Sequence, residues 1–184
     1  SNALREAGHH VLELDLPTED PSSPLRQIPQ DHVVFPALHG PWGEGGGAQL
    51  ELVELGLPFV GFGPDAAKVA MDKHQTRVLA SEHGVAIATG SVVHPGGPTP
   101  CPAPCVLKPL DEGSSVGLAL LHTENELATA MAQLTGPALC EAFVPGRECT
   151  VPWVLGQVLP VVEITPASGL YDHCLLYTSD AADE

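Results

Sequence analysis

Basic residues are scarce in this chain of 184 residues, in which seven lysines and arginines stand against 23 aspartates and glutamates, a formal charge of −16. A protein that binds DNA or RNA needs a positive surface for the phosphates, so the composition predicts no nucleic-acid partner. Aromatic residues make up only 4% of the chain, and the core must therefore be built from valine, leucine and alanine. No apolar run approaches the roughly 18 residues that span a bilayer, which predicts a cytoplasmic protein without a membrane partner.

A disulfide framework is also missing. The five cysteines are odd in number and irregularly spaced, as is typical of a reducing compartment: Cys101, Cys105, Cys140, Cys149 and Cys174. Cys101 and Cys105 have the spacing of half a metal site, but no second cysteine or histidine pair follows at zinc spacing. We therefore predict free thiols in a loop and no metal ligands in this chain.

The first part of the chain alternates short helical and extended patterns, which predicts an open α/β sheet. The predicted helices cover residues 2–7 and 48–55, and the predicted strands cover 11–14, 32–35 and 57–61, with a loop over 37–47. In the second helix we expect Leu50, Val53 and Leu57 to form the buried stripe, while Glu51 and Glu54 face solvent.

The second part of the chain has hairpin signals and two helix-capping patterns. Asp72 with Gln75 predicts the start of a helix that ends at Gly84, and Thr123 with Glu126 predicts a capping box. Strands are predicted over 91–94, 105–109, a short segment that ends at Leu121, 139–143, 148–155 and 158–164. The last two strands would pair around Gly156-Gln157 in a type II′ turn, so this part is predicted to be antiparallel, with a boundary near residue 70.

One segment has the composition of a phosphate-binding loop. Lys108 lies on a predicted strand and is followed by the sequence PLDEGSSVG, residues 109–117. Glycines allow backbone N–H groups to surround an anion, and the lysine supplies a positive charge for a phosphate oxygen. The order differs from a P-loop, because the lysine precedes the glycines. On composition alone, an ordinary Gly-Ser turn remains the alternative.

Five motifs follow one another along the chain: LHGPWGE (38–44), MDKHQT (71–76), VLKPLDEGSSVG (106–117), EAFVPGRECTV (141–151) and EITPASGLYD (163–172). In order and spacing they resemble the D-alanine–D-alanine ligases of the ATP-grasp superfamily. The resemblance extends from about Ala3 to Asp172.

The resemblance implies an α/β fold in two parts. Residues 1–70 would form a preATP-grasp (Rossmann-like) N-terminal domain whose first strand is missing, and residues 71–172 the central ATP-grasp domain with an antiparallel sheet. Residues 173–184 do not resemble the family, with Leu176 where its lysine is expected and Tyr177 at its tyrosine position. The C-terminal ATP-grasp domain with its metal ligands is expected to be absent, so the fragment alone would be inactive.

The activity that the resemblance implies is ATP-dependent joining of two D-alanines through an acyl phosphate, for peptidoglycan precursor synthesis. The expected cofactors are ATP and Mg²⁺ or Mn²⁺, the substrates two D-alanine molecules, and the intact enzyme a cytoplasmic homodimer. D-lactate or D-serine as second substrate, or a non-catalytic ATP-binding module, remain alternatives. A carbohydrate- or protein-binding domain ranks third, because it leaves the lysine-glycine-serine loop without a role.

The resemblance implies that five residues contact the phosphates and the adenine of ATP. Lys73 and Lys108 would contact the ATP phosphates. Glu141, Phe143 and Val144 would line the adenine pocket. Without the motif, an exposed strand glutamate is the plainer interpretation of Glu141.

Three further residues take roles from the same resemblance. Glu148 would bind the ribose hydroxyls, because a carboxylate is a suitable acceptor for two adjacent hydroxyl groups. Ser114 would lie in the loop that closes over the phosphate and the second substrate. His39 would lie near the substrate carboxylates.

Overall fold

The computed structural model describes residues 2–17, 19–113 and 115–165. It divides into two compact units, Ser1–Lys68 (unit 1) and Val69–Glu184 (unit 2). Within the described ranges, no helix has both the length and the apolarity needed to cross a bilayer.

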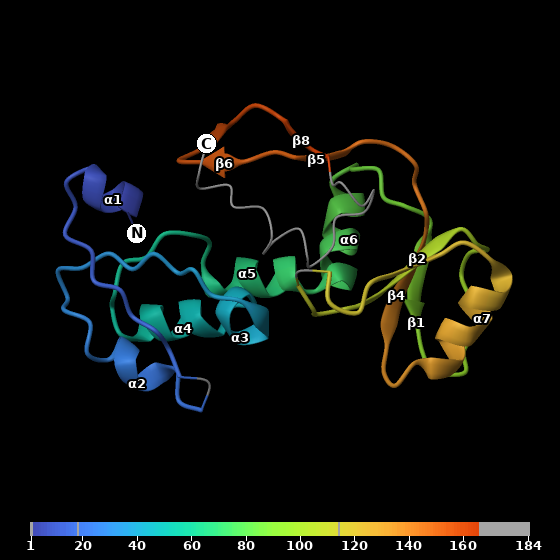
Figure 1. The fold of residues 1–184 in the computed structure, drawn as a ribbon, viewed down its shortest axis with the longest axis horizontal. Helices are drawn as coiled ribbons and strands as arrows, with labels where there is room; N and C mark the ends of the chain where they lie inside the picture. The colour runs from blue at the N-terminus through green and yellow to red at the C-terminus, as the bar shows by residue number, and fades with distance from the viewer. Residues whose placement is uncertain (1, 18, 114, 166–184) are drawn as a thin grey trace. The chain divides into compact units, whose positions relative to one another are not determined.

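Unit 1 is built mainly from short helices (Figure 1). They are α1 (Asn2–Glu6), α2 (Ser22–Leu25), α3 (Gly40–Glu44), α4 (Gly47–Glu54) and most of α5 (Pro64–Met71). Three buried leucines, Leu25, Leu52 and Leu57, form its core, and partly buried side chains such as Trp42 pack around them. The core is small because few apolar side chains converge there.

The strands predicted in unit 1 are largely wrong. Among the described residues of this unit, the only β pairing is a single parallel bridge between Val34 and Phe59, which has the predicted direction. Residues 11–14 have no ladder, and Leu12 and Leu14 remain 56% and 40% exposed. An extended segment without a hydrogen-bonding neighbour is not a strand, whatever its β propensity.

The buried face of α4 also differs from the predicted one. Ala48 and Leu52 point into the core, whereas Leu50 and Val53 are half exposed. Of the predicted stripe, Leu57 is buried as expected, and the Glu51 side chain, expected to face solvent, is only 17% exposed. Ala48 and Leu52 are four apart and thus share one side of the helix. Neighbouring elements decide which of two possible apolar stripes is covered. The predicted loop before α4 contains α3.

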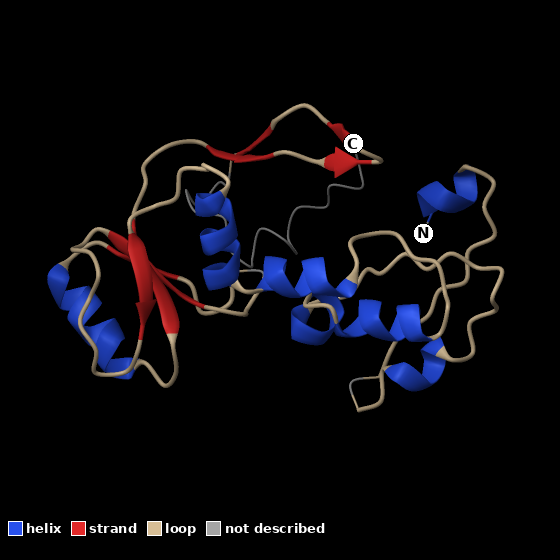
Figure 2. Ribbon diagram, turned by 180° about the vertical axis from the view of Figure 1, so that it is seen from behind, coloured by secondary structure: helices blue, strands red, loops and turns tan. Residues whose placement is uncertain are grey.

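Unit 2 contains a four-stranded antiparallel sheet in the order β1-β4-β2-β3. Its strands are β1 (Gly90–Val93), β2 (Cys105–Pro109), β3 (Ala119–Leu121) and β4 (Ala138–Ala142). Helix α7 (Glu124–Gln133) covers one face of the sheet (Figure 2). There Leu127 and Met131 belong to one buried cluster with Leu107 and Leu121. Glycine is required at position 90, because a Cβ there would lie 2.2 Å from the carbonyl oxygen of Cys140. The predicted antiparallel arrangement is confirmed.

Both predicted helix caps in unit 2 are confirmed. The Asp72 side chain accepts hydrogen bonds from the backbone N–H groups of His74 and Gln75 at the start of α6 (Lys73–Glu82). Thr123 and Glu126 form a reciprocal capping box at the start of α7. Such caps satisfy backbone donors that have no partner within the helix, and they depend only on residues near in sequence.

The last described part of unit 2 forms paired short strands. β5 (Glu148–Thr150) pairs with β8 (Val162–Ile164), and β6 (Trp153–Val154) pairs with β7 (Gln157–Val158). The two-residue loop is Leu155-Gly156, with φ values of 48° and 80°. Two left-handed residues define a type I′ turn, so the predicted type II′ turn around Gly156-Gln157 is one residue out of place.

Candidate functional site

A pocket in unit 2 gathers most of the residues predicted to bind nucleotide. It has a volume of about 370 Å³ and is lined by residues of β2, of β4 and of the segment that leads into β5. Five of the predicted residues line it: Lys108, Glu141, Phe143, Val144 and Glu148. They lie up to 40 positions apart in the sequence, and the sheet brings them together.

The sheet register places Lys108 and Glu141 on the same face. Glu141 on β4 lies opposite Val106 on β2, and Lys108 is two residues further along β2. Side chains two apart share a face of a strand, so Lys108 is the diagonal neighbour of Glu141. The Lys108 Nζ lies 2.5 Å from a carboxylate oxygen of Glu141.

Glu141 is the buried charged residue of this pocket. Only 8% of it is exposed, contrary to the exposed strand glutamate that we weighed from sequence. Its carboxylate pairs with Lys108 and with the guanidinium of Arg77. A buried carboxylate is tolerated where cations and hydrogen bonds replace its water, and both partners do so here.

Arg77 is the site residue that the sequence analysis missed. It lies on α6, donates to Glu141, and also donates to the backbone carbonyl oxygens of Ala88 (2.8 Å) and Gly90 (3.2 Å). These bonds fix the guanidinium between the helix and the sheet. A signal was available, because Arg77 follows Lys73 by four residues on one helical face, and the chain has few cations.

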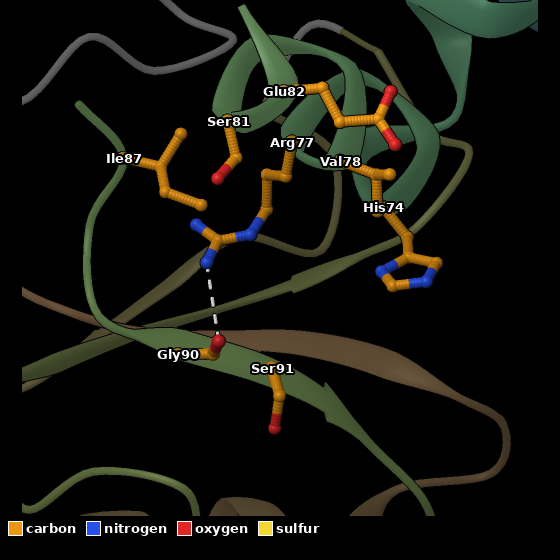
Figure 3. Close-up of a pocket in the computed structure, with 8 residues that line it drawn as sticks. All are labelled: His74, Arg77, Val78, Ser81, Glu82, Ile87, Gly90 and Ser91. Carbon is orange, nitrogen blue, oxygen red and sulfur yellow. Dashed lines mark hydrogen bonds between the residues drawn. The ribbon is translucent and has the colours of Figure 1, made fainter. Parts of the chain in front are cut away.

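Arg77 also lines a second hollow of about 350 Å³ between α6 and β1 (Figure 3). In the close-up its side chain extends from α6 toward the Gly90 carbonyl, with His74 and Ser81 on the same helix nearby. All hydrogen bonds of Arg77 given above point toward the sheet. Arg77 therefore forms part of the wall that separates this hollow from the Glu141 carboxylate.

Lys73, at the first position of α6, lies beside the segment that follows β2. Its Nζ donates to the carbonyl oxygens of Glu112 (2.5 Å) and Leu110 (3.4 Å), and its backbone N–H donates to Leu110. Burial lowers the pKa of Lys73, and the positive charge of Lys108 nearby lowers it further. Two lysines thus share one neighbourhood at the end of β2, which favours an anion there.

The remaining predicted residues differ in their settings. Phe143 and Val144 are 39% and 67% exposed, and Glu148 on β5 is exposed, so this side of the pocket is open. His39 belongs to unit 1, where it is the exposed N-cap residue of α3 in an extended conformation. Ser114 lies outside the described residues.

Comparison with known proteins shows which protein family the chain resembles. Residues 100–184 match the family model described as D-ala D-ala ligase C-terminus. The D-alanine–D-alanine ligase of Aquifex aeolicus is 38% identical, in an alignment that covers 100% of this chain and 65% of the relative. The ligase of Gluconobacter oxydans is 40% identical, over 92% of this chain and 59% of the relative. The chain belongs to the D-alanine–D-alanine ligase family.

Solved structures agree with this family assignment. The D-alanine–D-alanine ligase of Coxiella burnetii superposes with a TM-score of 0.61 at 26% identity, over 72% of this chain and 44% of that one. The ligase from Helicobacter pylori has a TM-score of 0.60 at 21% identity, over 69% and 42%, and shows likeness of fold. The predicted resemblance and the predicted ATP-grasp fold are confirmed. The chain spans 65% and 59% of the length of the two relatives given above.

Proposed function

We propose that this chain forms the nucleotide-binding part of an ATP-dependent ligase that joins two D-alanines for peptidoglycan precursor synthesis. The observation that carries the proposal is the convergence of Lys108, Glu141, Phe143, Val144 and Glu148 on one pocket. According to the motif resemblance, these residues would contact the phosphates, the adenine and the ribose of ATP. Relatives that are 38% and 40% identical bear the name of this enzyme.

The pocket fits a nucleotide by size and chemistry. About 370 Å³ lies within the range of roughly 300 to 1,000 Å³ that small-molecule sites occupy. Phe143 and Val144 supply an apolar wall for the adenine, while Glu141 supplies a carboxylate that accepts from the adenine amino group. Glu148 lies at the open side, where a ribose diol would reach its carboxylate.

The two lysines account for the triphosphate in this proposal. Lys73 and Lys108 place two positive charges near the end of β2, where phosphate oxygens would compete with Glu141 and with backbone carbonyls for them. For Lys73 the exchange favours phosphate, since ionised acceptors bind an ammonium group more strongly than carbonyls do. Lys108 would share its ammonium group between Glu141 and a phosphate oxygen when ATP binds, and Arg77 would keep that carboxylate in place.

The proposed reaction has two steps. The carboxylate of the first D-alanine attacks the γ-phosphorus of ATP and releases ADP, and the amine of the second D-alanine then displaces phosphate from the acyl phosphate. Bound cations would stabilise the charge that develops on the phosphoryl oxygens. In this scheme His39 orients the substrate carboxylates, and Ser114 belongs to the loop that closes over the phosphate.

A divalent cation, Mg²⁺ or Mn²⁺, would offset phosphate charge when bound. Such ions prefer carboxylate and other oxygen ligands. Among the described residues, the one cluster with metal-ligating geometry consists of cysteines and does not fit a hard cation. We therefore assign the divalent ion to none of this chain's described residues.

Three alternatives remain to be separated by experiment. D-lactate or D-serine in place of the second D-alanine would leave the same ATP pocket. A competition assay with D-alanine, D-lactate and D-serine, measured as turnover by the intact enzyme, tests which second substrate is used. A non-catalytic ATP-binding module would bind nucleotide without D-alanine-dependent phosphate release.

A homodimer in the cytoplasm is the assembly and location that we propose for the intact enzyme.

The test is a calorimetric titration of the 184-residue chain with ATP and Mg²⁺. We expect Lys108→Ala to weaken nucleotide binding by 10-fold or more, because one of the two phosphate cations is lost. Lys68→Ala is the matched control, since Lys68 is exposed on α5 and lines neither pocket. Equal affinities of the wild-type chain and Lys108→Ala, with folding intact, would contradict the proposal. D-alanine-dependent phosphate release by the intact enzyme then separates ligase from module.

A further inference from the structure

Three cysteine sulfurs converge on the sheet face opposite Glu141. Cys105 on β2 and Cys140 on β4 are both 0% exposed, and Cys101, in the segment before β2, is 5% exposed. All three Sγ atoms lie within 4.8 Å of one another. The Sγ atoms of Cys101 and Cys140 are 3.8 Å apart. The sequence analysis expected free thiols in a loop; they are free, but they are buried.

We propose that Cys101, Cys105 and Cys140 form a binding site for one soft d¹⁰ cation, of the class of Cu(I), Cd(II) and Hg(II). Three sulfurs that surround one ion at about 2.3 Å lie about 4 Å from one another, by the geometry of a triangle. The Cys101–Cys140 separation of 3.8 Å is close to that value, and the 4.8 Å limit on the other two separations allows it. Thiolate ligands select soft cations over Mg²⁺ or Ca²⁺.

Charge balance determines how the ion would be held. The cluster lies in the apolar core of unit 2 with Leu107, Leu121 and Leu127, where an uncompensated charge is costly. A divalent ion with two thiolates and one neutral thiol carries no net charge. Binding of a divalent ion therefore forms three metal–sulfur bonds. Two of them replace S–H bonds, whose two protons pass to the buffer, and the third is a lone-pair bond from the neutral thiol. A monovalent ion would reach the same balance with one thiolate and two thiols.

Cys101 is the most accessible of the three cysteines. It lies within the segment 95–104, before β2, and is 5% exposed, whereas Cys105 and Cys140 are 0% exposed. A ligand-exchange path can start at its sulfur and continue to Cys140, 3.8 Å away. The plain alternative is that three small apolar side chains simply fill the core.

The experiment is a titration of the 184-residue chain with Cd(II), in a variant that carries Cys149→Ser and Cys174→Ser and retains only the three clustered thiols. We expect one equivalent of Cd(II) to give a sulfur-to-cadmium charge-transfer absorbance and to release two protons to an indicator dye. Mg²⁺ in large excess should not displace it. The thermal midpoint should rise, because an ion bound by the folded state stabilises it.

Cys101→Ala in the same background is the decisive variant, because its position at the edge of the core limits the effect on folding. We expect Cd(II) affinity to fall by 10-fold or more while the metal-free thermal midpoint stays close to that of the parent. Cys140→Ala should also lose binding. Unchanged affinity in Cys101→Ala, or a thermal midpoint that falls on Cd(II) addition, would overturn the proposal, since the ion would then bind elsewhere or to the unfolded chain. The readout does not involve ATP, so failure here leaves the proposed ligase function untouched.

Discussion

The two units of this chain differ in the size of the apolar core that each builds. Unit 2 buries nine residues in one cluster under a four-stranded sheet, whereas unit 1 buries three leucines among short helices. The sheet gives each unit 2 side chain neighbours from several strands. In unit 1, one parallel bridge joins segments that are otherwise extended and exposed. How deeply a side chain is buried therefore depends more on pairing between strands distant in sequence than on the local propensity of its segment.

Truncation of one fully buried leucine in each unit would sharpen this comparison most. Leu127 and Leu52 are each 1% exposed. We expect Leu127→Ala to cost about 2 to 5 kcal/mol of unfolding free energy, because the larger core cannot collapse around the cavity. Leu52→Ala should cost less than that, since fewer neighbours are lost. Hydrogen exchange resolved by peptide reports each unit separately. A larger loss of protection in unit 1 than in unit 2 would break the comparison.

One carboxylate in each unit, Glu141 in unit 2 and the partly buried Glu51 in unit 1, provides the next test. Glu141 pairs with Arg77 and Lys108, whose side chains are 14% and 26% exposed, whereas Glu51 in unit 1 contacts Arg26, which is 69% exposed. Glu141→Gln should cost about 2 to 3 kcal/mol, somewhat below the value for a fully buried pair. Glu51→Gln should cost less than about 1 kcal/mol. Chemical denaturation of both variants checks this difference, and equal losses would contradict it.

A third prediction concerns the helix caps of unit 2. Thr123→Ala removes the capping-box acceptor of α7 and should cost about 1 kcal/mol. Thr123→Ser keeps the hydroxyl and serves as the matched control, with most of the stability retained. Thermal unfolding of the two variants provides the measurement. If Thr123→Ser lost as much as Thr123→Ala, the cap hydrogen bond would not be the cause.

The smallest expected effect is a pH dependence at Asp72. Backbone N–H donation from Gln75 and a bond from its side chain hold the pKa of Asp72 below its ordinary value of 3.8. A lowered folded-state pKa means that the stabilisation is complete above the ordinary value and is lost as the pH falls through the folded value. Asp72→Asn, which still caps, should remove this dependence. The measurement is unfolding free energy between about pH 5 and pH 2, compared for both proteins. Identical pH profiles would contradict the prediction.

Much of the secondary structure of unit 2 could be predicted from local sequence. The caps at Asp72 and Thr123 and the strands β1, β2 and β4 were predictable, because each depends on residues within a few positions or on a short apolar pattern. Motif order was sufficient for the family and for most pocket residues. The hairpin turn was misplaced by one residue, because Leu155 adopts a left-handed conformation that its side chain disfavours.

Distant neighbours decided what the local pattern left open. The segment 11–14 has strand propensity, yet no described partner pairs with it, and α4 buries Leu52 in place of Leu50 because of what surrounds it. The burial of Glu141 and the role of Arg77 depend on a contact between positions 64 residues apart.

The sequence by itself determined the family, the helix caps and the types of side chain available for a nucleotide. Only the tertiary structure decided that Glu141 is enclosed by two cations and that three cysteines meet on the opposite face of the same sheet. The physical reason is that capping and strand alternation act over a few residues, whereas burial and ion pairing depend on which strands become neighbours. Strand order β1-β4-β2-β3 sets that neighbourhood, and no local pattern specifies it.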